Sequence, residues 1–263
     1  MLIALATAWH PRGELARLEH NLPLLKQAYS GVSIALPPDA NVNIVRMLEF
    51  WPELTVTVTP EWSWGRYLAL KNALTYPVQY IMYADLDRLL RWVETQPAEW
   101  QQTIKALANQ DFLIIGRTER AYQTHPRALI ETEAISNRVT SYFLNLEVDV
   151  SAGAKGFSRQ AAEFIAANCQ GGQALGTDAE WPILLKRAGF RLDTVFVNGL
   201  DWETADRYQT QPADSQIQAT QAAAYDADPS SWSHRVNVAQ EIIQAAIAAQ
   251  NRILPPREYE PDL

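Results

Sequence analysis

Short apolar runs alternate with amphipathic stretches along the first half of the chain. Apolar and β-branched runs predict strands over residues 2–8, 32–36, 54–58, 80–84, 112–116, 153–157 and 191–197. Leu15, Leu18, Leu22 and Leu25 recur at helical spacing, which predicts a helix over residues 14–29. Similar patterns predict helices over residues 43–50, 64–74, 97–109, 126–144, 158–168, 179–188, 214–224 and 236–253.

Strands that alternate with helices predict an α/β fold with a mostly parallel central sheet and helices on both faces. Such sheets bind ligands at the carboxyl ends of their strands. The pattern weakens after Asp201, and no repeat or Gly/Ser-rich linker divides the chain. We therefore expect a core over residues 1–205 and a C-terminal lid or helical extension over residues 206–263, whose Pro-rich end is typical of a disordered tail.

Two carboxylates follow the apolar strand over residues 80–84, in the run Asp85-Leu86-Asp87. Because side chains alternate along an extended backbone, we expect both carboxylates to point the same way. Like charges this close are unfavourable unless a cation joins them. Mg²⁺ and Mn²⁺ take oxygen ligands, commonly one or two carboxylates plus substrate phosphates. The run predicts a site for a metal-bound diphosphate; the alternative is a solvated turn after a strand.

Composition narrows the classes of function. The chain has 263 residues and a formal net charge of −8, which disfavours broad nucleic-acid binding. The single Cys169 excludes an intramolecular disulfide and fits a reducing cytoplasm. The apolar N-terminal run is short and no basic residue precedes it, so we expect a first strand rather than a signal peptide. No apolar run approaches the length that spans a bilayer.

Several common catalytic motifs are absent from the sequence. It contains no G-x-G-x-x-G after the first strand, no G-x-x-x-x-G-K-[ST] and no G-x-S-x-G. A Rossmann dehydrogenase and a P-loop NTPase are therefore disfavoured, as is a nucleophile elbow. The four His and one Cys are scattered and form no structural zinc pattern.

The order of the remaining motifs resembles that of a known family. A helix with Arg66, Lys71 and Asn72 precedes the strand that ends at Asp85-Leu86-Asp87. A basic, Gly-containing segment over residues 153–159 follows, and then the run over residues 177–181, Thr-Asp-Ala-Glu-Trp. Over roughly residues 1–205 the chain resembles the GT-A glycosyltransferases, which have the Rossmann-like nucleotide-diphospho-sugar transferase fold.

The resemblance implies roles for individual residues. Asp85 and Asp87 match the metal-binding D-x-D, and Asp85 would face either the ribose or the metal. Asp178 and Glu180 match the acidic acceptor motif, although Asp-Ala-Glu departs from the usual Glu-Asp and leaves the catalytic base in doubt; helix capping is the alternative for Asp178. The residues expected to hold the nucleotide and diphosphate are Thr7, Trp9, Asp39, Arg66, Lys71, Asn72, Asp85 and Lys155.

The third metal ligand stays open between two candidates. In the family it often comes from the segment after the late strand or from near the C-terminus. Here Glu203 follows the predicted strand over residues 191–197, and His234 lies further on. For His234 the simpler interpretation is a residue at a helix start with no ligand.

The resemblance implies a metal-dependent glycosyltransferase of the hexosyltransferase type. It would use Mn²⁺ or Mg²⁺ to move a sugar from a nucleoside-diphosphate sugar to a small-molecule or glycan acceptor. One alternative is a nucleotidyltransferase that forms a sugar nucleotide, although the loop Trp9-His10-Pro11-Arg12-Gly13 is poorer in glycine than is usual there. Another is a non-catalytic nucleotide- or glycan-binding protein. Donor, acceptor, stereochemistry and oligomeric state stay open.

Overall fold

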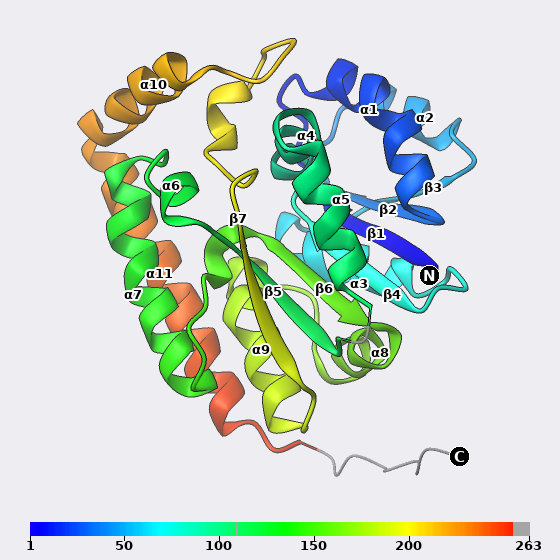
Figure 1. The fold of residues 1–263 in the computed structure, drawn as a ribbon, viewed down its shortest axis with the longest axis vertical. Coiled ribbons are helices and arrows are strands. Elements are labelled where there is room, and N and C mark those ends of the chain that lie inside the picture. The colour runs from blue at the N-terminus through cyan, green and yellow to red at the C-terminus, as the bar shows by residue number, and fades with distance from the viewer. Residues whose placement is uncertain (109, 255–263) are drawn as a thin grey trace.

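One mixed sheet forms the centre of the molecule in the computed structural model, which describes residues 1–108 and 110–254. Its strands lie in the order β3-β2-β1-β4-β6-β5-β7, and only β6 runs antiparallel to its neighbours. The strands are β1 Ile3–Ala8, β2 Gly31–Leu36, β3 Leu54–Val58, β4 Tyr80–Ala84, β5 Phe112–Arg117, β6 Ala154–Ser158 and β7 Leu192–Val197. The predicted mostly parallel sheet is confirmed (Figure 1).

Helices cover both faces of this sheet. They are α1 Leu15–Ala28, α2 Val42–Glu49, α3 Gly65–Ala73, α4 Leu86–Thr95, α5 Pro97–Ala106, α6 Glu119–Tyr122, α7 Arg127–Leu144, α8 Arg159–Asn168, α9 Thr177–Arg187, α10 Ser215–Ala227 and α11 Pro229–Asn251. Short 3₁₀ turns occur at η1 Trp62–Trp64, η2 Val150–Ala152, η3 Ala174–Gly176 and η4 Glu203–Asp206.

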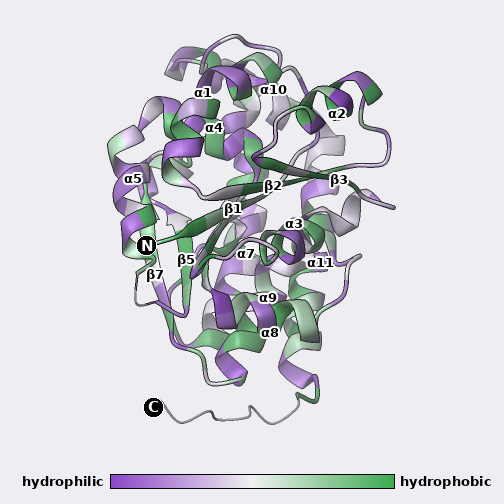
Figure 2. Ribbon diagram, turned by 90° about the vertical axis from the view of Figure 1, so that its right-hand side faces the viewer, coloured by the Kyte–Doolittle hydropathy of each residue, from purple (hydrophilic) through white to green (hydrophobic). Residues whose placement is uncertain are grey.

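Each face of the sheet has its own hydrophobic core. One core joins the sheet to α1, α4 and α5 through large side chains such as Leu25, Trp92 and Trp100. The other joins it to α3, α8 and α9 and includes Trp181. Figure 2 shows the sheet between these two layers, with α1 and α4 on one side and α8 and α9 on the other.

The last helix packs into the second core. In α11, the side chains of Val238, Ile242, Ala246 and Ala249 are buried at helical spacing against α7 and α9. One core cluster therefore contains residues from both sides of the boundary expected at residue 205, and the division of the chain there stays a prediction. The expected tail over residues 255–263 lies outside the described residues. Within the described part, no helix combines the length and hydropathy needed to cross a membrane.

Helices α4 and α6 are absent from the sequence prediction, and others begin or end elsewhere than predicted. Helix α4 was not predicted, although Leu86, Leu89, Leu90 and Val93 recur at helical spacing and are buried. Helix α11 begins at Pro229 rather than at residue 236, because the side chain of Asp228 accepts a hydrogen bond from the Ser230 amide and caps it. The predicted helix over residues 97–109 ends at Ala106, and Asn109 lies outside the described residues.

Candidate functional site

A cleft of about 1040 Å³ opens at the carboxyl ends of β1, β2 and β4. Its other walls come from η1 and the start of α3, from η3, from η4 and from the first half of α11. Ligands of open α/β sheets bind at this edge. Seven of the residues singled out in the sequence line this one cleft: Trp9, Asp39, Arg66, Asp85, Asp87, Glu203 and His234.

The D-x-D run spans a strand end and a helix start. Asp85 is the last extended residue and occupies the N-cap of α4, while Asp87 lies in the first helical turn. The expectation that both residues continue an extended strand was therefore wrong, because the apolar positions from Leu86 onward favour a helix. Both carboxylates still line the cleft, since the helix begins at its floor.

A buried polar network fixes Asp85. Its Oδ2 accepts a hydrogen bond from Arg66 Nη2 at 2.7 Å, and its Oδ1 accepts one from the Tyr83 hydroxyl. The other end of Arg66 donates to Asp178 Oδ1 at 2.6 Å, and the same oxygen accepts from Lys155 Nζ at 2.6 Å. Asp85 is therefore held by side chains rather than free to rotate.

Asp178 lies beneath the cleft and does not line it. It is 2% exposed and makes no capping hydrogen bond to α9, so simple capping does not explain it. Burial alone would raise the pKa of Asp178, but the neighbouring Arg66 and Lys155 charges outweigh burial and lower it to about 2. Asp178 is therefore ionised, and it acts on the cleft by orienting Arg66.

Asp87 and Glu203 bring two carboxylates to the cleft with little compensation. Burial, the charge of Glu203 and the charge of Asp85 raise the pKa of Asp87 to about 7. Arg88 Nε lies 3.4 Å from Glu203 Oε1, while Glu203 Oε2 is buried without a hydrogen-bond partner. This part of the cleft has an excess of negative charge that a cation would neutralise.

The donor set fits a divalent cation that shares its ligands with a phosphate. The described residues contain no group of three or more His, Cys, Asp or Glu side chains already arranged around an ion position. Asp87 and Glu203 nevertheless offer two neighbouring carboxylates, of which Glu203 is paired with Arg88 and keeps one oxygen unbonded. Because Mg²⁺ takes few protein carboxylates and completes its shell with water and substrate phosphates, Asp85, Asp87 and Glu203 could hold it once a diphosphate is bound.

The remaining predicted binding residues lie away from the cleft lining. Thr7 is fully buried in β1, and its hydroxyl has no hydrogen-bond partner. Asn72 Nδ2 donates to Thr57 Oγ1 at 2.7 Å, and Lys71 lies over the ring of Tyr67. Lys155 is fully buried beneath the cleft. The structure therefore groups Lys155 with the Asp178 network and leaves Lys71 and Asn72 on the outer part of α3.

Glu180 is also buried, but it lies two residues after Asp178 and so on a different face of α9. Its Oε1 accepts a hydrogen bond from Arg252 Nη2 at 2.5 Å, at the end of α11. Burial raises the pKa of Glu180, and the hydrogen bond from Arg252 opposes that rise. This contact joins α9 to the end of α11, so the two residues of the predicted acceptor motif occupy separate environments.

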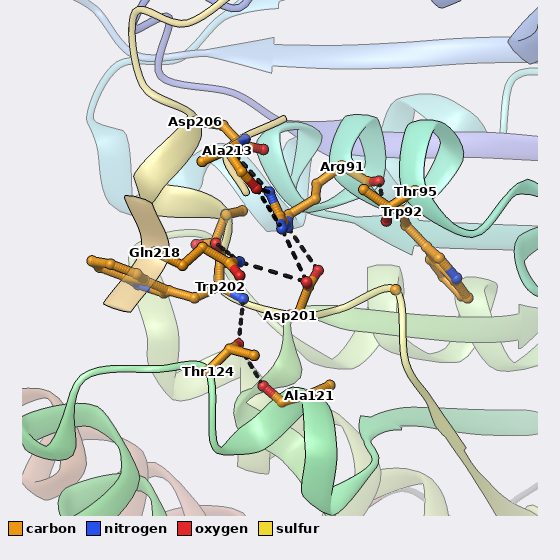
Figure 3. A network of polar contacts seen from close by, with 12 residues as sticks. Arg91, Trp92, Thr95, Ala121, Thr124, Asp201, Trp202, Asp206, Ala213 and Gln218 are labelled. Atoms are coloured by element: carbon orange, nitrogen blue, oxygen red, sulfur yellow. Dashed lines mark hydrogen bonds and ion pairs between the residues drawn. The ribbon is translucent and has the colours of Figure 1, made fainter. Parts of the chain in front are cut away.

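A buried arginine holds the segment that carries Glu203. Arg91 of α4 forms a two-point ion pair with Asp201, through Nε at 2.7 Å and Nη2 at 3.0 Å. It also donates to Asp206 Oδ1 at 2.7 Å and to the carbonyl of Ala213. Figure 3 shows Arg91 between Asp201 and Asp206, with Ala213 alongside. Helix α4 therefore carries the D-x-D at one end and fixes the position of Glu203 further along.

Three arginines of the cleft were not expected from the sequence: Arg12, Arg88 and Arg207. Arg12 follows the first strand directly, so the rule that ligands bind at strand ends could have found it. Arg207 lies at the cleft because the ion pairs of Arg91 hold the segment after β7 against α4. No local sequence pattern predicts this long-range contact. Trp62 lines the cleft as well and is 61% exposed.

The mostly parallel sheet, the helices on both faces and the helical C-terminal part confirm the predicted α/β architecture. No protein-family model and no curated protein matches this chain. Among solved structures, the chain is similar to 4-diphosphocytidyl-2C-methyl-D-erythritol synthase from Anaerococcus prevotii. The two are 13% identical, with a TM-score of 0.43, and the match covers 86% of this chain and 99% of the other.

Proposed function

We propose that this chain is a GT-A-type glycosyltransferase that moves a sugar from a nucleoside-diphosphate sugar to a hydroxyl acceptor, assisted by Mn²⁺ or Mg²⁺. The observation that carries this proposal is the cleft in which Asp85, Asp87 and Glu203 meet at the carboxyl edge of the sheet. The cleft is large enough for a nucleotide sugar, since pockets for drug-sized ligands have about 300–1,000 Å³.

The reaction requires that negative charge on the departing diphosphate be neutralised. A bound divalent cation would supply that neutralisation as a Lewis acid. The chain's part is to place the carboxylates: Arg66 and Tyr83 hold Asp85, and Arg88 lies beside Glu203. Because these partners fix the carboxylates before a ligand arrives, little reorganisation accompanies binding.

We assign Asp178 a positioning role in this scheme, because it reaches the cleft only through Arg66. Glu180 and its partner Arg252 both lie outside the cleft lining, and the catalytic role of Glu180 stays a prediction. The titratable side chains that α11 itself presents to the cleft are His234 and Glu241. His234 therefore stays a candidate, beside Glu203, for completing the ligand set around the cation.

A second candidate reaction is the formation of a sugar nucleotide by nucleotidyl transfer. It is favoured by one specific observation: His10 and Arg12, from the loop after β1, both line the cleft. Basic residues at this place suit a nucleoside triphosphate, which carries more charge than a diphosphate. The two reactions differ in product, because sugar transfer releases a nucleoside diphosphate and nucleotidyl transfer releases pyrophosphate.

Thermal unfolding with nucleotides tests the shared part of the proposal. A nucleoside diphosphate that binds the native state raises Tm by mass action, and we expect this rise to need Mn²⁺ or Mg²⁺. A panel of UDP, GDP, CDP and ADP, each with and without the metal, identifies the base. No rise with any nucleotide would refute nucleotide binding. Assays for free nucleoside diphosphate and for pyrophosphate, with candidate donors, then separate the two reactions.

A further inference from the structure

Two arginines of the cleft wall have no acidic partner. Arg12 comes from the loop between β1 and α1, and Arg207 comes directly after η4. Among the described residues, neither guanidinium forms an ion pair or a hydrogen bond. The Nε–H of Arg207 is buried and lacks an acceptor. A buried donor without an acceptor is costly, and native structures rarely leave one without a purpose.

The backbone holds these two arginines side by side. The Tyr208 amide donates to the Arg12 carbonyl at 2.9 Å, which joins the two segments. Gly13 has φ +99°, and a Cβ there would lie 2.7 Å from the Cα of Tyr208. Tyr208 itself has φ +61°, an unfavourable conformation for a non-glycine residue. The junction is therefore closely packed, and the chain accepts local backbone strain at the place that brings Arg12 and Arg207 together.

The electrostatics of the pair differ from those of the other arginines in the cleft. Arg66 is paired with Asp85 and Asp178, and Arg88 lies beside Glu203. Burial, followed by the charge of Arg12, lowers the pKa of Arg207. The charges of Asp87 and Glu203 act on Arg207 from a distance without a hydrogen bond. The cleft thus contains, among the described residues, a cationic pair without ion-pair partners next to the carboxylates of Asp87 and Glu203, of which Glu203 is paired with Arg88.

We propose that Arg12 and Arg207 form a phosphate-binding subsite of the cleft. Guanidinium groups match phosphate oxygens with paired N–H donors, and two of them can hold one phosphoryl group from two sides. A phosphate there would accept from the unbonded Nε–H of Arg207 and would face the cation position at Asp85, Asp87 and Glu203. The location of the subsite beside a metal rests on the proposed function, whereas the arginine pair itself does not.

Two sources could supply this phosphate. One is the diphosphate of the nucleotide donor, bound between the metal and the arginines. The other is a phosphate carried by the acceptor, which would occupy the subsite while the donor is bound. The two differ in whether inorganic phosphate can bind to protein that is already saturated with a nucleoside diphosphate and Mn²⁺.

Titration calorimetry on the full chain tests the subsite. The ligands are inorganic pyrophosphate, inorganic phosphate and UDP, each with Mn²⁺. If the Tm panel identifies another nucleoside diphosphate, it replaces UDP. The variants are Arg12→Gln and Arg207→Gln. Arg127→Gln is the matched control, because Arg127 is exposed on α7 and, among the residues that the structure describes, its only ion pair is a 3.7 Å contact with Glu131. Charge-assisted hydrogen bonds of this kind contribute about 1.5–3 kcal/mol, so each variant should bind at least about tenfold more weakly.

The pattern of losses identifies the source of the phosphate. Weaker binding of pyrophosphate and UDP in both variants assigns the subsite to the donor diphosphate. Phosphate binding that persists in UDP-saturated protein and disappears in both variants assigns it to the acceptor. Wild-type binding of all three ligands in Arg12→Gln and Arg207→Gln overturns the subsite, as does a wild-type protein that binds none of them. A protein that binds pyrophosphate or phosphate, loses that binding in both variants, and binds none of the nucleoside diphosphates supports the subsite and refutes the proposed function.

Stability of the ligand-free protein separates a binding role from a structural one. If the pair exists to bind an anion, Arg207→Gln removes a like-charge repulsion and a buried unbonded donor. The variant should then unfold at the same Tm as the wild type or at a higher one. A clear fall in Tm, with unchanged ligand affinity, would make Arg207 a structural residue and overturn the proposal.

Discussion

At the scale of single residues, the cleft keeps charges in an arrangement that does not favour stability. Asp87 and Glu203 repel one another, and so do Arg12 and Arg207. Asp178, in contrast, is fully compensated by two cations. We expect Asp87, Glu203, Arg12 and Arg207 to bind a ligand that carries both signs of charge, such as a metal-bound phosphate, and Asp178 to keep the floor of the cleft in place.

Asp87→Asn should stabilise the ligand-free protein at pH 8. The pKa of Asp87 is about 7 in the folded state and near 3.8 in the unfolded chain. Because the folded pKa is raised, the wild type loses stability as the pH rises from about 4 to 7, and the loss is complete above 7. The variant lacks this loss, so its Tm should exceed that of the wild type at pH 8 and equal it near pH 4.

Calorimetric or spectroscopic melting of both proteins at pH 8 and near pH 4 measures this difference in Tm. A second set of melts at pH 8 adds Mn²⁺ with a nucleoside diphosphate. The ligand should raise Tm of the wild type by several degrees and leave the variant unchanged, since the variant lacks the carboxylate. A lower Tm for the variant at pH 8 would mean that Asp87 stabilises the fold.

Asp178→Asn should destabilise the fold strongly, by about 3–5 kcal/mol, because it leaves the buried Lys155 without a counter-charge and removes one of the two carboxylates paired with Arg66. Glu180→Gln is the comparison, since its partner Arg252 is 31% exposed and can return to water. Urea unfolding of the two variants measures the difference. Equal, small losses would show that the Asp178 network contributes little to folding.

At the scale of elements, α4 connects both halves of the site. It begins with Asp85 and Asp87 and carries Arg91 one turn later, so the floor of the cleft and the anchor of η4 belong to one rigid helix. The strands were predictable because their apolar runs are short and bounded by turn residues. Helix α4 was not predicted, because its first residues, Asp85-Leu86-Asp87, directly follow an apolar strand and fit a strand end as well as the helical spacing of Leu86, Leu89 and Leu90.

The candidate site was predictable to the extent that its residues lie at strand ends. Trp9, Asp39 and Asp85 follow apolar strands, and strand ends of a parallel sheet share one edge. The pairing of Asp178 with Arg66 and Lys155 joins three distant elements, and sequence alone carries no signal for such a contact. The same holds for Arg207.

Arg91→Lys tests whether the cleft depends on the contacts of Arg91 with Asp201, Asp206 and Ala213. Lysine keeps the charge but cannot form the two-point contact with Asp201 while also reaching Asp206 and Ala213. We expect faster hydrogen exchange over residues 200–213 and at least about tenfold weaker binding of a nucleoside diphosphate with Mn²⁺, because Glu203 and Arg207 lose their fixed positions.

Arg120→Lys is the matched control, since Arg120 contacts Asn198 near the start of the same segment but at the surface. It should leave both measurements at wild-type values. If Arg91→Lys binds the nucleoside diphosphate with wild-type affinity despite faster hydrogen exchange over residues 200–213, ligand binding in the cleft does not depend on the contacts of Arg91.

At the scale of the whole molecule, the cleft lies between two walls of different construction. The strand ends and α4 form one wall, which is continuous with the core of the sheet. The segment after β7 and the start of α11 form the other, where His234 is exposed and Arg207 lacks a partner. A ligand that touches both walls should therefore order the second wall more than the first.

Hydrogen exchange of the free and liganded protein checks this expectation. With a nucleoside diphosphate and Mn²⁺, protection should rise over residues 207–212 and over 229–237, and change little over residues 201–206, which Arg91 already holds. Equal protection of residues 199–237 in both states would show a second wall that is fixed before the ligand binds.

The ion pairs that close the cleft join distant parts of the chain: Arg17 meets Asp206 across 189 positions, and Arg91 meets it across 115. Contacts of such separation tend to form late during folding, since closing a long loop costs entropy. A chain still emerging from the ribosome builds β1, β2 and β4 long before Asp206 has been synthesised. Ligand affinity should therefore appear only after Asp206 has been made, and a fragment that stops short of Asp206 should bind no nucleotide.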